Sequence, residues 1–136
     1  MATRSRIGIE NENGRIESIY CHWDGHPGTN GKTLAEHYTD VEKIKALIAL
    51  CDISSLHENV GPADGVEHSF DKPAEGVTVA YHRDRGEDFR KPRENNSVEA
   101  FTKSDVEEYG YVFTRDGEWK VVLGQGKIKN LSEVLK

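Results

Sequence analysis

Two pairs of alternating segments dominate the hydrophobic pattern of the chain. Residues 6–10 and 15–23 flank the dipeptide Asn13-Gly14, and residues 109–114 and 118–123 flank Arg115-Asp116-Gly117. Alternation of apolar and polar positions on both sides of an Asn-Gly or Asp-Gly dipeptide is typical of a β-hairpin. The pattern therefore predicts one hairpin in each half of the chain.

The length of each turn decides which side chains share a face. With a two-residue turn at Asn13-Gly14, one face of the first hairpin holds Ile7, Ile9, Ile16, Ser18 and Tyr20. That turn also sets Glu10 opposite Glu17, which is unfavourable, so a longer loop around residues 11–14 stays open. At the second hairpin, the Asp-Gly turn pairs Arg115 with Glu118. One face of that hairpin then holds Val112, Thr114, Trp119, Val121 and Leu123.

Helical spacing is clearest between residues 41 and 50. The apolar residues that recur there are Val41, Ile44, Leu47, Ile48 and Cys51, the expected buried stripe of an amphipathic helix. Residues 39–42 fit a capping box at its start. Shorter helices are predicted at residues 32–38 and 131–135, the second capped by Asn130, and a turn of helix at residues 104–107. Residues 76–82 are a predicted strand, and residues 52–75 and 83–97 are predicted loops.

Two hairpins, one further strand and two or three helices predict the α+β class. The expected architecture is an antiparallel β-sheet with the helices packed on one face. The length of 136 residues fits a single domain spanning residues 1–136.

Charge and composition narrow the range of functions. The chain has 18 basic and 24 acidic residues and a net charge of −6, which disfavours direct nucleic-acid binding because phosphate backbones attract basic surfaces. No apolar run approaches the roughly 20 residues of a membrane helix, and the first residues lack the apolar stretch of a signal peptide. The two cysteines form no Cys-x-x-Cys pair. We expect a soluble intracellular protein that works without a membrane, and a homodimer would add buried core.

Aromatic and basic residues concentrate where the predicted strands pass into loops. Aromatic faces stack on bases and Arg or Lys binds phosphate, so this pattern favours a small nucleotide-type ligand. The candidate ligand-binding residues are Tyr20, His22, Trp23, Asp24, Lys32, Tyr81, Arg83 and Arg85. Of these, the three basic residues are expected to hold phosphate and Trp23 and Tyr81 to stack. The competing interpretation is a set of core aromatic residues beside a salt-bridged loop.

The sequence patterns for nucleotide hydrolysis, metal binding and cysteine catalysis are weaker. Residues 28–33 resemble a phosphate loop, but His26 stands where its first glycine is required. The cluster of His22, Asp24, His26 and His37 keeps a metal-assisted phosphoesterase open as an alternative, although no structural-zinc spacing is present. Cys21 and its neighbour His22 point to opposite faces of a strand, which argues against a nucleophile–base pair. We therefore expect no catalytic residue, no bound metal and no cofactor.

Some longer strings of the chain are distinctive. They are the opening Thr3-Arg4-Ser5-Arg6-Ile7-Gly8-Ile9, then Ile19-Tyr20-Cys21-His22-Trp23-Asp24-Gly25, Gly31-Lys32 with Glu36-His37-Tyr38, Asp52-Ile53-Ser54-Ser55-Leu56 and Tyr81-His82-Arg83-Asp84-Arg85-Gly86-Glu87. Over residues 3–90 the chain resembles a family of small, largely uncharacterised proteins encoded by tailed bacteriophages and prophages. The resemblance implies a phage accessory protein in the host bacterial cytoplasm, and it carries over no catalytic residues.

By analogy with other small acidic phage proteins, that context suggests a counter-defence protein. Such a protein would act by binding, either sequestering a nucleotide-type immune signal or inhibiting a host defence protein. The sequence thus favours a binding protein over an enzyme, with a small nucleotide-type ligand or a host defence protein as its partner.

Overall fold

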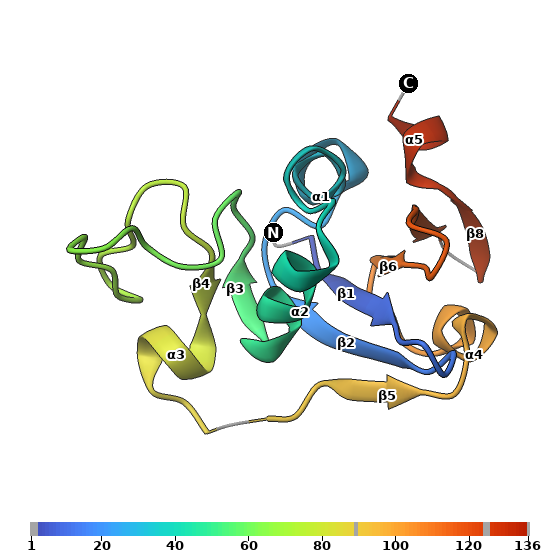
Figure 1. Cartoon of the computed structure of the whole chain (residues 1–136), viewed down its shortest axis with the longest axis horizontal. Coiled ribbons are helices and arrows are strands. Elements are labelled where there is room, and N and C mark those ends of the chain that lie inside the picture. Colours follow the sequence, from blue (N-terminus) through green and yellow to red (C-terminus); the bar gives the residue numbers. More distant parts are fainter. Residues whose placement is uncertain (1–2, 89, 124–125, 136) are drawn as a thin grey trace.

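The fold is α+β, with one mixed sheet flanked by helices (Figure 1). The computed structural model describes residues 3–88, 90–123 and 126–135. Its strands are β1 (Ser5–Glu10), β2 (Ile16–Cys21), β3 (Ile53–Ser55), β4 (Val79–Ala80), β5 (Arg93–Asn95), β6 (Tyr109–Phe113), β7 (Trp119–Leu123) and β8 (Lys127–Asn130). Its helices are α1 (Lys32–His37), α2 (Val41–Ala49), α3 (Tyr81–Arg85), α4 (Val98–Lys103) and α5 (Leu131–Val134), and a π-helical turn, η1 (Pro27–Gly31), precedes α1.

The strand order is β4-β3-β2-β1-β6-β7-β8, and β5 also pairs with β2. The expectation of a purely antiparallel sheet made of two hairpins and one strand is wrong, because β1 runs parallel to β6 and β2 runs parallel to β3. A parallel neighbour requires a long crossover connection. Between β2 and β6 the chain makes that crossover through the helices and short strands of residues 22–108, which joins the two hairpins along β1 and β6.

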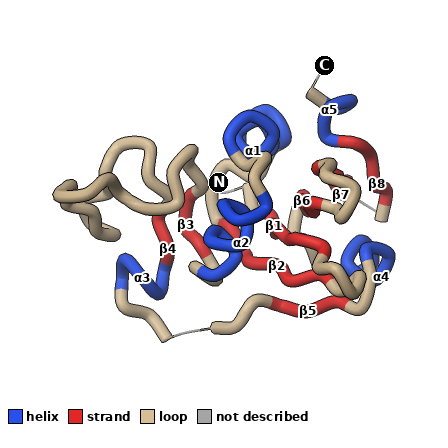
Figure 2. The backbone as a smooth tube through the Cα atoms, viewed as in Figure 1, coloured by secondary structure: helices blue, strands red, loops and turns tan. Residues whose placement is uncertain are grey.

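Helices cover both faces of the sheet, whereas the sequence predicted one. The larger core contains β-strand residues such as Ile7 and Ile19 together with Leu34 of α1, Leu47 of α2 and Leu131 of α5. A smaller core on the opposite face packs α4 against the sheet (Figure 2). Its buried members are Ile16, Phe101, Val106, Val112 and Val122.

Each hairpin turn is one residue longer than a two-residue turn. In the first hairpin the backbone N–H of Asn11 donates to the carbonyl of Arg15 at 2.8 Å, and Gly14 has a φ of 83°. In the second, the N–H of Thr114 donates to the carbonyl of Glu118 at 2.9 Å, and Gly117 has a φ of 85°. A glycine in this left-handed region closes a three-residue turn. The longer first loop, left open by the sequence, is therefore confirmed.

The extra residue changes which side chains share a face. Ile7 lies opposite Ile19, so the isoleucines of β1 face the larger core, while Ile16, Ser18 and Tyr20 face the other way. In the second hairpin Phe113 pairs with Trp119. Both facial groupings predicted from two-residue turns are therefore wrong.

The helices predicted at residues 32–38, 41–50 and 131–135 are found, with differences at their ends. Helix α2 spans Val41–Ala49, and the side chain of Asp40, rather than that of Thr39, caps it by accepting from the N–H of Glu42 at 3.1 Å. Val41 was expected in the buried stripe but is exposed. Asn130 precedes α5 but makes no side-chain cap, because its amide oxygen accepts from Nζ of Lys120.

Short polar elements are the ones that the pattern missed. The predicted strand over residues 76–82 is cut to β4, since α3 begins at Tyr81. The predicted loops contain β3 and β5, and β8 precedes α5. The turn of helix expected at residues 104–107 is wrong, because the helix of this region, α4, ends at Lys103. Among the described residues, no helix has the length and apolar character needed to cross a membrane.

Candidate functional site

Four of the predicted site residues gather around the start of β3. The N–H groups of His22 and Trp23 donate to the carbonyls of Ile53 and Ser54, at 3.2 and 3.0 Å, so the chain continues along β3 after β2 ends. A carboxylate oxygen of Asp52 accepts from the N–H of Tyr20 at 3.0 Å. The N–H of Tyr81 donates to the Asp52 carbonyl at 3.3 Å. We call Tyr20, His22, Trp23 and Tyr81 the Trp23 surface.

Three rings of this surface are ordered by contacts with one another, whereas the ring of Tyr81 contacts that of Phe70. The hydroxyl of Tyr20 and Nδ1 of His22 are 2.8 Å apart. The His22 ring meets the indole of Trp23 edge-on, with 4.7 Å between the ring centroids. Edge-to-face contacts of this kind stabilise aromatic pairs beyond the area that they bury. The indole is therefore positioned by its neighbours although 45% of Trp23 is exposed.

The turn after Trp23 fixes its backbone. The buried amide of Asn30 donates to the Trp23 carbonyl at 2.9 Å and to Sγ of Cys21 at 3.3 Å. Asp24 adopts a φ of 59°, and its carbonyl accepts from the hydroxyl of Thr29 at 2.5 Å. The Gly-rich segment that resembled a phosphate loop thus holds Trp23 in place.

A small cleft lies beside this surface. Tyr20, Asp52, Tyr81 and His82 contribute to its walls, and its volume is about 160 Å³. Pockets for ligands of nucleotide size are usually about 300–1,000 Å³. Burial raises the pKa of the Tyr20 and Tyr81 phenols, so both stay neutral hydrogen-bonding groups near pH 7. The cleft is too small to enclose a nucleotide.

Arg83, expected to hold phosphate, instead makes hydrogen bonds to other groups of the protein. Its guanidinium donates to the carbonyl of Val60 at 2.6 Å, to the carbonyl of Thr78 at 2.7 Å and to the carboxylate of Asp84 at 2.8 Å. These contacts fasten residues 56–78, the segment between β3 and β4, to the sheet. The guanidinium therefore stabilises the fold and is not available for a phosphate group.

Asp84 sits at the centre of this network. Its carboxylate also accepts from the N–H of Ala80 at 2.8 Å and lies 3.1 Å from Nε2 of His68. Because Nδ1 of His68 accepts from the N–H of Ala74, the ring proton resides on Nε2 and is donated to Asp84. Burial raises the pKa of Asp84, but the hydrogen bonds from Arg83, Ala80 and His68 outweigh it and hold that pKa below its usual range.

The remaining basic candidates lie apart from a common anion site. Arg85 forms an ion pair with Glu87 at 3.6 Å, and its guanidinium carbon lies 4.8 Å from the ring centroid of Phe70. Lys32 is exposed at the first position of α1, and Asp24 is exposed in the turn before η1. The structure brings the rings of Tyr20, His22 and Trp23 into contact, and Tyr81 lines the same cleft as Tyr20. It does not add a set of converging cations.

His22 and His26, two of the residues suggested for a metal site, make other side-chain contacts. Nδ1 of His26 accepts from the N–H of Gly28 at 3.1 Å, and the ring contacts that of Tyr109. In the described parts of the chain, no group of three or more His, Cys, Asp or Glu residues could hold a metal ion. Burial raises the pKa of the Cys21 thiol to about 12, which disfavours the thiolate that a nucleophile needs.

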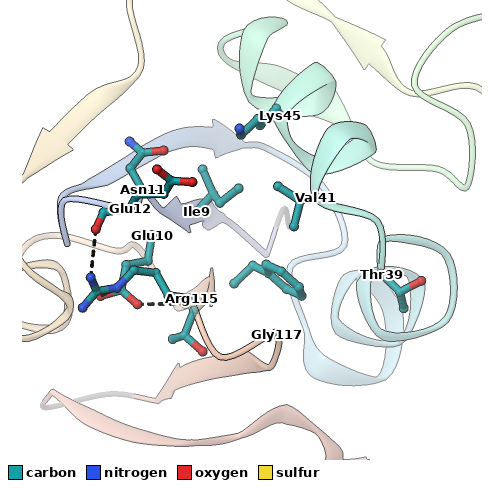
Figure 3. Close-up of a pocket in the computed structure, with 11 residues that line it drawn as sticks. Ile9, Glu10, Asn11, Glu12, Thr39, Val41, Lys45, Arg115 and Gly117 are labelled. Atoms are coloured by element: carbon teal, nitrogen blue, oxygen red, sulfur yellow. Dashed lines mark hydrogen bonds and ion pairs between the residues drawn. The ribbon is translucent and has the colours of Figure 1, made fainter.

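A larger pocket lies elsewhere and was missed by the sequence. It has a volume of about 500 Å³ and opens between the two hairpin turns and the start of α2 (Figure 3). Strand residues Ile9 and Phe113 contribute to it, and Val41 lines it from the helix. The available signal was Val41, an apolar residue at the first position of a helix. Which strand residues line the pocket with it depends on the register of both hairpins.

Neither a scan against protein-family models nor searches of the curated proteins and the solved structures find a match to this chain.

Proposed function

We propose that this chain is a non-enzymatic binding protein that inhibits a host defence protein through the Trp23 surface. In this proposal it is a phage counter-defence protein of the host bacterial cytoplasm. The phage context comes from the resemblance of residues 3–90 and stands as part of the proposal.

The observation that carries the proposal is the exposure of Trp23 on an ordered backbone. Hydrogen bonds from its N–H to Ser54 and from Asn30 to its carbonyl hold it on both sides. Tryptophan is strongly enriched among the residues that contribute most to protein–protein binding. A pre-positioned ring also loses little conformational entropy on association. An indole held in this way supports a protein partner.

The charges support a protein partner over a nucleotide-type signal. A nucleotide needs cations at its phosphates, and the guanidinium of Arg83 is already bound by Asp84 and two carbonyls. The net charge of −6 suits a partner with a basic surface. Because exposed charges are screened by salt, the affinity should fall as ionic strength rises.

The test is an affinity capture from host bacterial lysate with matched variants. The bait proteins are the wild-type chain, Trp23→Ala and the control Val66→Ala, which removes a comparably exposed apolar side chain from residues 56–78. A partner retained by the wild type and Val66→Ala but lost by Trp23→Ala supports the proposal. Equal capture by both variants contradicts it.

A native mass spectrum of the unrefolded protein separates the other possibilities. A retained mass of nucleotide size would favour sequestration of a signal over inhibition of a protein. The same spectrum gives the oligomeric state and so tests the expected homodimer. A bare polypeptide mass agrees with the proposed function.

A further inference from the structure

The pocket at the hairpin tips has an apolar base with charged groups around it. Ile9 and Phe113 are register partners on the parallel strands β1 and β6, and both are buried. Val41, 42% exposed, adds an apolar wall from α2. Figure 3 shows Lys45 entering from the helix side, with Asn11 and Glu12 across from it on the turn between β1 and β2.

Two of the charged groups hold the rim together. The N–H of Arg115 donates to Oε1 of Glu10 at 3.0 Å, and its Nε lies 3.5 Å from Oε2 of the same carboxylate. The guanidinium also donates to the carbonyl of Glu12 at 2.9 Å. These contacts tie the second hairpin turn to the first, so the pocket is formed before any ligand enters.

Other polar groups of the rim are occupied as well. The amide of Asn11 donates to the carboxylate of Glu17 at 2.8 Å. The hydroxyl of Thr114 donates to the carbonyl of Glu118 at 3.0 Å. By contrast, the side chains of Lys45 and Glu12 have no hydrogen bond or ion pair to any residue in the described ranges. One cation and one anion thus remain available on the wall of the pocket.

We propose that this pocket binds a small zwitterion with an apolar body, an α-amino acid with a large apolar side chain. Its carboxylate would meet Lys45, its ammonium group Glu12, and its side chain the surface made by Ile9, Val41 and Phe113. The volume of about 500 Å³ lies within the usual range of small-ligand pockets. This binding does not depend on the Trp23 surface.

The test uses three probes that share an apolar body. Backbone NMR shifts of the full chain are followed during titration with L-phenylalanine, 3-phenylpropionate, which lacks the amine, and phenethylamine, which lacks the carboxylate. We expect saturable shifts at the residues of this pocket. Since partly exposed ion pairs contribute about 0.2–1 kcal/mol, L-phenylalanine should bind up to about fivefold more tightly than either analogue.

Two substitutions test separately whether Lys45 binds the carboxylate and Glu12 binds the ammonium group. Lys45→Met should remove the preference for L-phenylalanine over phenethylamine, and Glu12→Gln should remove the preference over 3-phenylpropionate. Both side chains are exposed, so the folded spectrum should persist. The control Lys32→Met changes an exposed lysine of α1 and should leave all three affinities unchanged. Equal binding of the three probes, shifts only at other residues, or no saturable shift would each overturn the proposal.

Discussion

The carboxylate of Asp84 lies 3.1 Å from Nε2 of His68, and both side chains are almost fully buried, at 4% and 2% exposure. This pair joins α3 to residues 56–78, an irregular segment whose isolated β-bridge pairs Asn59 with Val77 within the segment itself. A carboxylate with four donors around it thus orders a long stretch of irregular chain beside the Trp23 surface.

Asp84→Asn should destabilise the protein by about 2 kcal/mol or more. The substitution removes a charged acceptor and leaves buried donors poorly paired. The measurement is the midpoint of urea unfolding. Asp71→Asn is the matched control, because Asp71 is exposed in the same segment. Equal midpoints for the two variants would contradict the role given to Asp84.

Acid should weaken the fold through the same residue. The pKa of Asp84 is lowered in the folded protein, because hydrogen bonds to its carboxylate outweigh the effect of burial. Its contribution to stability is therefore fully present above the unfolded pKa of about 3.9 and is lost as the pH falls through the lower folded value. Urea midpoints recorded from pH 6 downward should fall more steeply in the wild type than in Asp84→Asn. Parallel curves would show that other groups control the acid response.

The two hairpin turns should be sensitive to any side chain at their glycines. Gly14 and Gly117 have φ values of 83° and 85°, and no atom crowds either Cβ position, so a substitution there pays for backbone strain alone. Gly14→Ala and Gly117→Ala should each cost about 1 kcal/mol. Gly28→Ala is the control, since its φ is outside the left-handed region and its new Cβ would make only ordinary contacts. A loss in Gly28→Ala as large as in the turn variants would argue against this reason.

The two tryptophans should respond differently to a quencher. Trp119 is buried and donates from Nε1 to the carbonyl of Tyr38 at 2.8 Å, whereas Trp23 is exposed. Trp23→Phe should remove the acrylamide-accessible part of the fluorescence and leave a protected emission. The reverse result, with protected emission lost, would contradict the placement of Trp23.

The hydrophobic pattern predicted the helices and hairpins that depend on neighbouring residues in the sequence. The apolar spacing of Ile44, Leu47 and Ile48 places α2 correctly, and alternation around the Asn-Gly and Asp-Gly dipeptides places both hairpins. The register of the first hairpin was left open and that of the second was missed, because a left-handed glycine adds one residue to each turn and period-two alternation does not report that residue. The parallel pairing of β1 with β6 depends on a crossover of the chain and has no local signal.

The candidate site likewise has a part that local sequence predicts and a part that it does not. Tyr20 lies in β2 and His22 and Trp23 follow that strand directly, so their proximity is a consequence of local sequence. The hydrogen bonds of Arg83 could not be predicted from local sequence, because its carbonyl partner Val60 lies 23 residues away. The Asp84 network also needs His68, which local pattern does not indicate either. The large pocket was hidden for the same reason, since it joins two hairpin turns and α2 across the fold.

Fluorine NMR of the chain labelled with 5-fluorotryptophan tests the proposed binding surface most directly. The two tryptophans give two resonances, and Trp23→Ala assigns them. Addition of the captured host partner should shift or broaden the Trp23 resonance and leave that of the buried Trp119 unchanged. A Trp23 resonance that stays at its free position and linewidth while the partner is bound would contradict binding through this surface.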